Sequence, residues 1–74
     1  MVSVKVCWKQ NGKPAEGRKV AVSFDGLTGG ITGNEFTNSS GEVHFDVDPG
    51  QGKVYVDGNT AFTGWVQGMI VVYL

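Results

Sequence analysis

Apolar and polar residues alternate along four short stretches of the chain, each bounded by residues typical of turns. The apolar positions are Val2, Val4, Val6 and Trp8; Val20, Val22 and Phe24; Val43, Phe45 and Val47; and Val54 and Val56. Side chains two residues apart lie on the same face of a strand, so each stretch predicts a half-buried strand with these residues directed inward. A further short strand is expected through residues 35–37.

The stretches between these predicted strands favour turns. Asn11-Gly12, Ser40-Gly41 and Asp57-Gly58 are turn sequences, and the 12 glycines of the chain weigh against helices. No stretch shows the 3.6-residue apolar period of an amphipathic helix. A chain of 74 residues has room for one hydrophobic core. We therefore predict a single all-β domain over residues 1–74, a small antiparallel Greek-key β-sandwich of about seven strands.

The C-terminal stretch breaks the alternation because it is apolar at both odd and even positions. It consists of Met69, Ile70, Val71, Val72, Tyr73 and Leu74. A strand covered on both faces has this pattern, whereas a two-layer sandwich covers only one face of each strand. We expect the second face or an edge to meet another subunit, with Trp65 nearby and with Ile70, Val72 and Leu74 forming the apolar contact. Alternatively, the large side chains of a small protein wrap around each other.

The size of the domain makes its stability marginal. Scaling relations give about 7,000 Å² of surface buried on folding. If about 60% of it is apolar, this burial contributes about 105 kcal/mol. Ordering the chain costs about 110 kcal/mol, so the two terms cancel, and domains of this size are usually stabilised by disulfides, a metal or oligomerisation. Cys7 is the only cysteine, which excludes a disulfide within the chain.

Several features bear on location and partners. A single cysteine fits a reducing compartment. Alternation begins at Val2, with no signal-peptide pattern before it, and no apolar run reaches the length of a membrane span. We therefore expect a cytoplasmic protein with no membrane partner. The net charge of −1 argues against nucleic acid as a partner.

Charge is distributed unevenly along the chain. Residues 1–19 carry five of the six basic residues, and the rest of the chain carries six of the seven acidic ones. One interpretation is that strands of opposite charge lie beside each other in one sheet and pair across it. The other is a head-to-tail contact between subunits.

Residues typical of turns and strands follow one another in a characteristic order over residues 2–58. Its residues are Gly12, Pro14, Gly17, Val20, Val22, Thr37, Asn38, Gly41, Val43, Phe45, Val47, Pro49, Gly50, Val54, Val56 and Gly58. This order resembles the carboxypeptidase regulatory-like domain. The resemblance implies a seven-stranded sandwich of the transthyretin-like (prealbumin-like) type, with the C-terminal stretch supplying the last strand or strands. It also implies an accessory role, because domains of that family usually stabilise, bind or link.

One enzyme group of similar fold, the hydroxyisourate hydrolases, differs from this chain at its functional residues. Those enzymes use several histidines, an arginine and a C-terminal Tyr-Arg-Gly-Ser. This chain has one histidine, His44, and ends in Val71-Val72-Tyr73-Leu74. The resemblance therefore does not carry their activity over to this chain.

Few residues could perform chemistry. Cys7 and His44 are the candidates for a nucleophile–base pair, and both are expected to face solvent on strands that could be neighbours. No helix N-terminus or glycine-built oxyanion nest accompanies them, so we predict no catalytic site.

A metal site has one weak set of candidates. Glu42, His44 and Asp46 alternate along one face of a predicted strand. Their spacing of about 6.6 Å per two residues is long for one ion, so a solvated polar face is the expectation and a metal site at these residues is the alternative. We predict no resident metal and no cofactor.

These observations predict a non-enzymatic module for protein–protein interaction or self-assembly through the apolar strand Met69–Leu74. The expected partner is a second copy of the chain or another protein. The alternative function is a small-ligand or carbohydrate-binding module. It would use the loop of residues 25–34 and the exposed ring of Trp65 or Tyr55.

Overall fold

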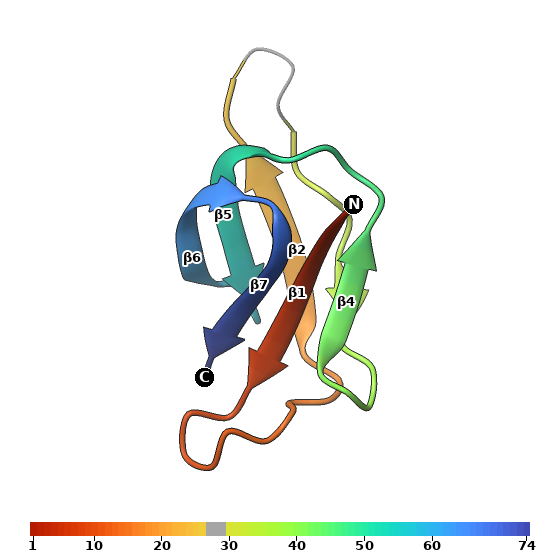
Figure 1. The fold of residues 1–74 in the computed structure, drawn as a ribbon, viewed down its shortest axis with the longest axis vertical. Helices are drawn as coiled ribbons and strands as arrows, with labels where there is room; N and C mark the ends of the chain where they lie inside the picture. Colours follow the sequence, from red (N-terminus) through yellow and green to blue (C-terminus); the bar gives the residue numbers. More distant parts are fainter. Residues whose placement is uncertain (27–29) are drawn as a thin grey trace.

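The computed structural model describes residues 1–26 and 30–74, which form two β-sheets packed against each other (Figure 1). The strands are β1 (Val2–Cys7), β2 (Lys19–Phe24), β3 (Glu35–Phe36), β4 (Glu42–Phe45), β5 (Gly50–Val56), β6 (Asn59–Val66) and β7 (Gly68–Tyr73). The predicted all-β, two-layer domain is thereby confirmed. Within the described ranges, no helix has the length and apolar character needed to cross a membrane.

The three-stranded sheet has the order β4-β1-β7, with β1 in the centre. On one side, β1 pairs with β4 in an antiparallel register that sets Val2 opposite Phe45. On the other side, it pairs with β7 in parallel, from Val2 opposite Gly68 to Cys7 opposite Tyr73. This parallel pair differs from the purely antiparallel sandwich that the sequence predicts. Parallel neighbours need a long crossover connection, and here the whole chain between β1 and β7 supplies it.

The four-stranded sheet has the order β3-β2-β5-β6, and all of its strand pairs are antiparallel. Strands β5 and β6 form a hairpin whose two-residue turn, Asp57-Gly58, has positive φ angles of 52° and 85°. A turn with two positive φ angles matches the twist of a hairpin and favours Asp-Gly. This dipeptide marks the start of β6, a strand that alternation alone does not reveal. Only Gln67 separates β6 from β7, so the chain crosses there from one sheet to the other.

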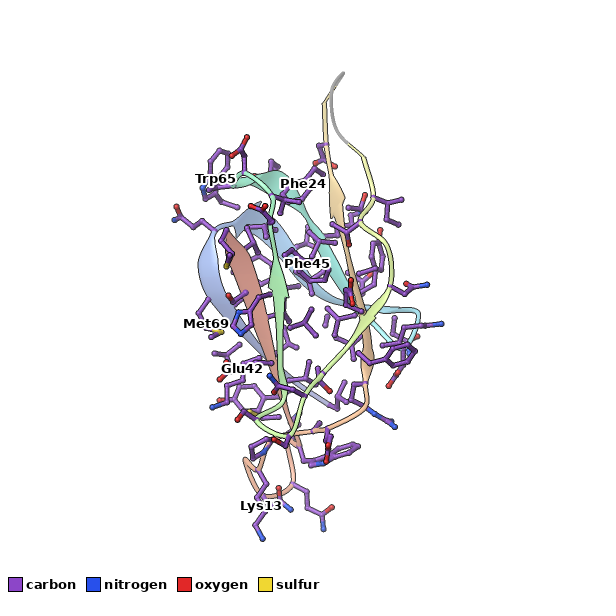
Figure 2. The ribbon with its side chains drawn as sticks, turned by 90° about the vertical axis from the view of Figure 1, so that its right-hand side faces the viewer. Lys13, Phe24, Glu42, Phe45, Trp65 and Met69 are labelled. Carbon is purple, nitrogen blue, oxygen red and sulfur yellow. The ribbon has the colours of Figure 1, made fainter. Side chains whose placement is uncertain are left out.

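The core lies between the two sheets and is built mainly from valine. Its fully buried members are Val2, Val4, Val6, Val20, Val22, Val54, Val56 and Val66. Figure 2 shows Phe45 between the sheets, and Phe24 and Val47 pack against the edge of the same cluster. The inward positions predicted from alternation are therefore confirmed, with one exception.

The exception is Trp8, which is 39% exposed rather than buried. Strand β1 ends at Cys7, and Trp8 already belongs to the following turn, where its carbonyl oxygen accepts a 2.7 Å hydrogen bond from the Gly12 amide. Because the strand ends one residue before Trp8, its alternation does not direct this side chain into the core. Its ring instead lies 5.6 Å from the guanidinium carbon of Arg18, a cation–π arrangement on the surface.

Thr37 fastens the long β1–β2 connection to the segment that follows β3. Its side chain is buried, and its hydroxyl donates a 2.6 Å hydrogen bond to the carbonyl oxygen of Ala15. The same hydroxyl oxygen accepts a 2.9 Å bond from the Arg18 amide. One buried hydroxyl thus satisfies two backbone groups of the connection.

Replacing Thr37 with valine should destabilise the fold without changing its shape. The substitution keeps the volume but leaves the two backbone groups without partners, which should lower the free energy of unfolding by about 1–3 kcal/mol. Urea denaturation monitored by tryptophan fluorescence would measure the loss. The matched change Thr63→Val, at an exposed position of β6, should stay within about 0.5 kcal/mol of the wild type. Equal stability of the two variants would contradict this role of Thr37.

Gly52 allows β2 and β5 to approach closely. It lies opposite Phe24 in the register, and a Cβ atom at this position would overlap the carbonyl oxygen of Ser23. Because the overlapped atom belongs to the backbone of a neighbouring strand, no side-chain rotation can relieve the contact.

We therefore expect Gly52→Ala to lower the free energy of unfolding by about 3 kcal/mol, or to prevent folding, because the two strands must separate. Gly33→Ala is the matched control, since a Cβ there would meet nothing within 4 Å. Circular dichroism during thermal unfolding would compare the two. A Gly52→Ala variant as stable as Gly33→Ala would show that the strands are not so closely packed.

Candidate functional site

The outer face of the three-stranded sheet carries polar side chains on two strands and apolar ones on the third. The register aligns two rows across β4, β1 and β7, namely His44–Ser3–Met69 and Glu42–Lys5–Val71. Alternation along each strand places these residues on the face away from the core. Glu42 and His44, two of the candidate residues identified from the sequence, lie on this face.

His44 is held between two polar neighbours. Its Nδ1 atom lies 2.7 Å from the Ser3 hydroxyl, and its Nε2 atom lies 3.5 Å from a carboxylate oxygen of Glu42. Glu42 and His44 share a face because they are two residues apart on β4. Ser3 joins them because the β1–β4 register places it opposite His44. Alternation predicts that Ser3 faces outward, but only the pairing of the strands shows which residue it meets.

A serine, a histidine and a carboxylate in this order match the elements of a nucleophilic triad. Catalysis also requires donors aimed at a developing oxyanion and a site that excludes water. Here the side chains of His44 and Glu42 are 48% and 26% exposed on an open sheet, and none of the three residues lines either of the two surface hollows described below. The group of Ser3, His44 and Glu42 therefore fits a solvated hydrogen-bonded network better than an active site.

Cys7 does not take the position expected for it. It is 5% exposed, so the prediction of a solvent-facing thiol is wrong. Its backbone bridges Pro14 on one side and is paired with Tyr73 on the other. Cys7 also lies four residues from Ser3, about 13 Å along an extended strand. The structure therefore brings Ser3, and not Cys7, against His44.

The three weak metal candidates are only partly brought together. Glu42 and His44 approach each other, whereas Asp46 lies beyond the end of β4. Among residues 1–26 and 30–74, no group of three or more His, Cys, Asp or Glu side chains is arranged to hold a metal ion.

Strand β7 divides its apolar residues between the core and the surface. Ile70 packs against the core and Val72 is a member of it, so these two side chains cannot form the outward contact predicted from the sequence. The outward side chains are those of Met69, Val71 and Tyr73, which are 47%, 44% and 60% exposed. Leu74 and Trp65 are also exposed, and Figure 2 shows Met69 on the outer side of the three-stranded sheet.

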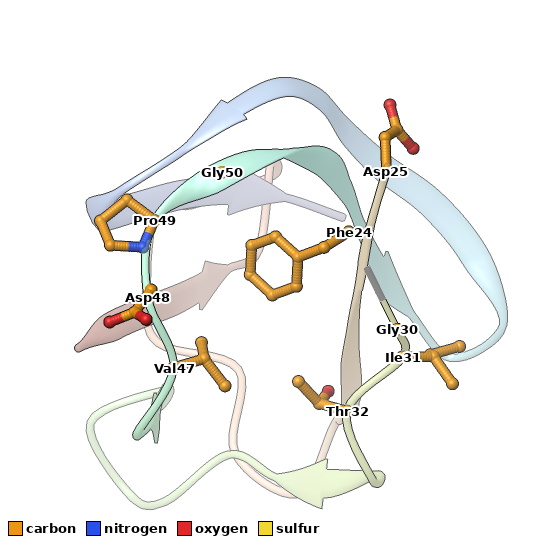
Figure 3. Close-up of a pocket in the computed structure, with 9 residues that line it drawn as sticks. All are labelled: Phe24, Asp25, Gly30, Ile31, Thr32, Val47, Asp48, Pro49 and Gly50. Carbon is orange, nitrogen blue, oxygen red and sulfur yellow. The ribbon is translucent and has the colours of Figure 1, made fainter. Parts of the chain in front are cut away.

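A hollow of about 460 Å³ opens at one end of the sandwich (Figure 3). Its lining residues are Phe24, Asp25, Gly30, Ile31, Thr32, Val47, Asp48, Pro49 and Gly50. The predicted binding loop, residues 25–34, thus contributes four of them, while its residues 27–29 lie outside the described residues. Trp65 does not line this hollow, and Tyr55 lines a second, smaller hollow of about 210 Å³ beside Ala21.

An activated ester can test whether Ser3, His44 and Glu42 perform nucleophilic catalysis. We expect the wild type and Ser3→Ala to hydrolyse p-nitrophenyl acetate at the same slow rate without an initial burst, because an exposed imidazole alone accounts for such hydrolysis. Stopped-flow absorbance would record the first turnover, and His44→Ala would remove the imidazole contribution. A burst that disappears in Ser3→Ala would instead identify Ser3 as a nucleophile.

Comparison with known proteins adds no relative, since no family model, curated protein or solved structure matches the chain. The resemblance to carboxypeptidase regulatory-like domains stays a prediction from the order of turns and strands.

Proposed function

We propose that the chain is a non-enzymatic β-sandwich module that self-associates through strand β7. The observation that carries this proposal is an unprotected sheet edge. Among residues 1–26 and 30–74, strand β7 pairs with β1 alone, so its other side offers backbone groups without a strand partner there, and its outward residues are apolar. Such an edge is a ready template for another strand.

Strands β6 and β7 are built without charged residues. Residues 59–74, which form β6 and β7, contain no Asp, Glu, Lys, Arg or His. These two strands lie at the left of Figure 1 and form the outer strands of their respective sheets. Proteins commonly protect exposed edges with charged side chains or proline. The opposite edges follow that practice, with Glu35 on β3 and with Glu42 and His44 on β4.

A second copy of the chain is the partner that fits this edge. Antiparallel pairing of two β7 strands about a two-fold axis would join the three-stranded sheets into one and set the apolar stripes of both copies side by side. Strand β7 itself carries no charged side chain, and Lys5, the partner of Val71, lies one strand away on β1. Self-association would also add the stabilisation that a domain of this size needs.

We infer that the sandwich is of the transthyretin-like type and the domain carboxypeptidase regulatory-like, with an accessory role. The order of the matching turns and strands over residues 2–58 supports this assignment, and the seven strands in two sheets accord with it.

The association can be disrupted at positions that leave the core intact. We expect the wild type to keep a constant multiple of its monomer mass across a hundredfold dilution, and the double variant Met69→Lys/Val71→Lys to be monomeric, because two charges would be buried at the seam. Light scattering after size-exclusion chromatography measures the mass, and circular dichroism checks the fold.

The control is Phe36→Lys, which removes an apolar side chain that is 65% exposed on β3, the outer strand at the opposite side of the molecule. This variant should associate like the wild type. A wild type that is monomeric at every concentration, or a double variant that associates like Phe36→Lys, would refute the role of β7.

A further inference from the structure

The hollow in Figure 3 has an apolar floor that the core holds in place. Phe24 lies at its centre and packs against the core cluster, as does Val47. Pro49 and Ile31 add further apolar lining, and Ile31 is otherwise 69% exposed. A volume of about 460 Å³ falls within the range of small-molecule sites.

Backbone hydrogen bonds hold the end of β2, which carries Phe24. The Phe24 amide donates a 2.7 Å hydrogen bond to the Gly30 carbonyl oxygen, and the Asp25 amide donates a 2.8 Å bond to that of Gln51. Gly50 leaves room for the ring, since a Cβ there would lie 3.2 Å from its Cδ1 atom. The floor is therefore formed before any ligand arrives, which lowers the entropy lost on binding.

The charge of the hollow has one sign. Two carboxylates, Asp25 and Asp48, belong to its lining, and the nine lining residues include no Lys, Arg or His. Figure 3 shows Asp25 and Asp48 on opposite sides of the Phe24 ring, with their carboxylates directed outward at the rim. In the part of the chain that the structure describes, neither forms an ion pair. Their negative potential is thus not neutralised by a nearby basic side chain.

We propose that this hollow binds a small organic cation with an apolar body, such as an arylalkyl ammonium ion. The apolar body packs on Phe24, Val47 and Pro49, where burial of its surface supplies the affinity. The ammonium group lies at the rim of the hollow, where the combined negative potential of Asp25 and Asp48 attracts it. This site is separate from the proposed self-association, because none of its lining residues belongs to β7.

Titration of the ¹⁵N-labelled chain with phenethylammonium, followed by two-dimensional NMR, tests the proposal. We expect saturable shifts at the amides of Phe24, Ile31, Val47 and Asp48. The anion 3-phenylpropionate has a similar shape and the opposite charge, and it should cause no saturable shift at these amides. The double variant Asp25→Asn/Asp48→Asn should bind phenethylammonium at least tenfold more weakly.

Asp46→Asn is the matched control. It removes the same charge from an exposed position near the hollow that is not part of its lining, and it should retain wild-type affinity. The proposal is overturned if phenethylammonium gives no saturable shift, if 3-phenylpropionate binds equally well, or if the double variant and Asp46→Asn have the same affinity. Because the readout is local to the hollow, it holds for the monomer and for the assembled chain alike.

Discussion

The parallel pairing of β1 with β7 is the interaction on which the rest of the structure depends. It joins residues near the two ends of the described chain, Val2–Cys7 and Gly68–Tyr73, into neighbouring strands. The inward residues of β1, Val2, Val4 and Val6, are fully buried only when β7, β4 and the opposite sheet surround them. A contact between segments so distant in sequence closes a loop of nearly the whole chain, and the entropy lost in closing it is offset only when the other strands pack as well.

This pairing also gives the molecule two unlike sides. Because β7 lies at the edge of its sheet and Gln67 connects it directly to β6, the uncharged end of the chain occupies one side of the sandwich. The polar row of Ser3, His44 and Glu42 forms toward the other edge, where β4 flanks β1. The same arrangement thus separates a solvated network from an apolar edge within one small face.

The two proposals use different physical means of recognition. At β7, backbone groups and an apolar stripe offer a second copy both hydrogen bonds and buried area. At the hollow, a preformed aromatic floor and two carboxylates select a ligand by shape and charge. The sandwich places these features on different residues, so each can be removed by substitution without altering the other.

The fold class and most of the core follow from the pattern of residues alone, because alternation with a period of two leaves few choices for which face of a strand is buried. The pattern predicted the inward valines of β1, β2 and β5 and located the Asp57-Gly58 turn. The inward direction of Ile70 and Val72, the burial of Cys7 and the contact of Ser3 with His44 became evident only from the folded chain. Those facts follow from strand register and from where a strand ends, and both are set by contacts between residues far apart in the chain.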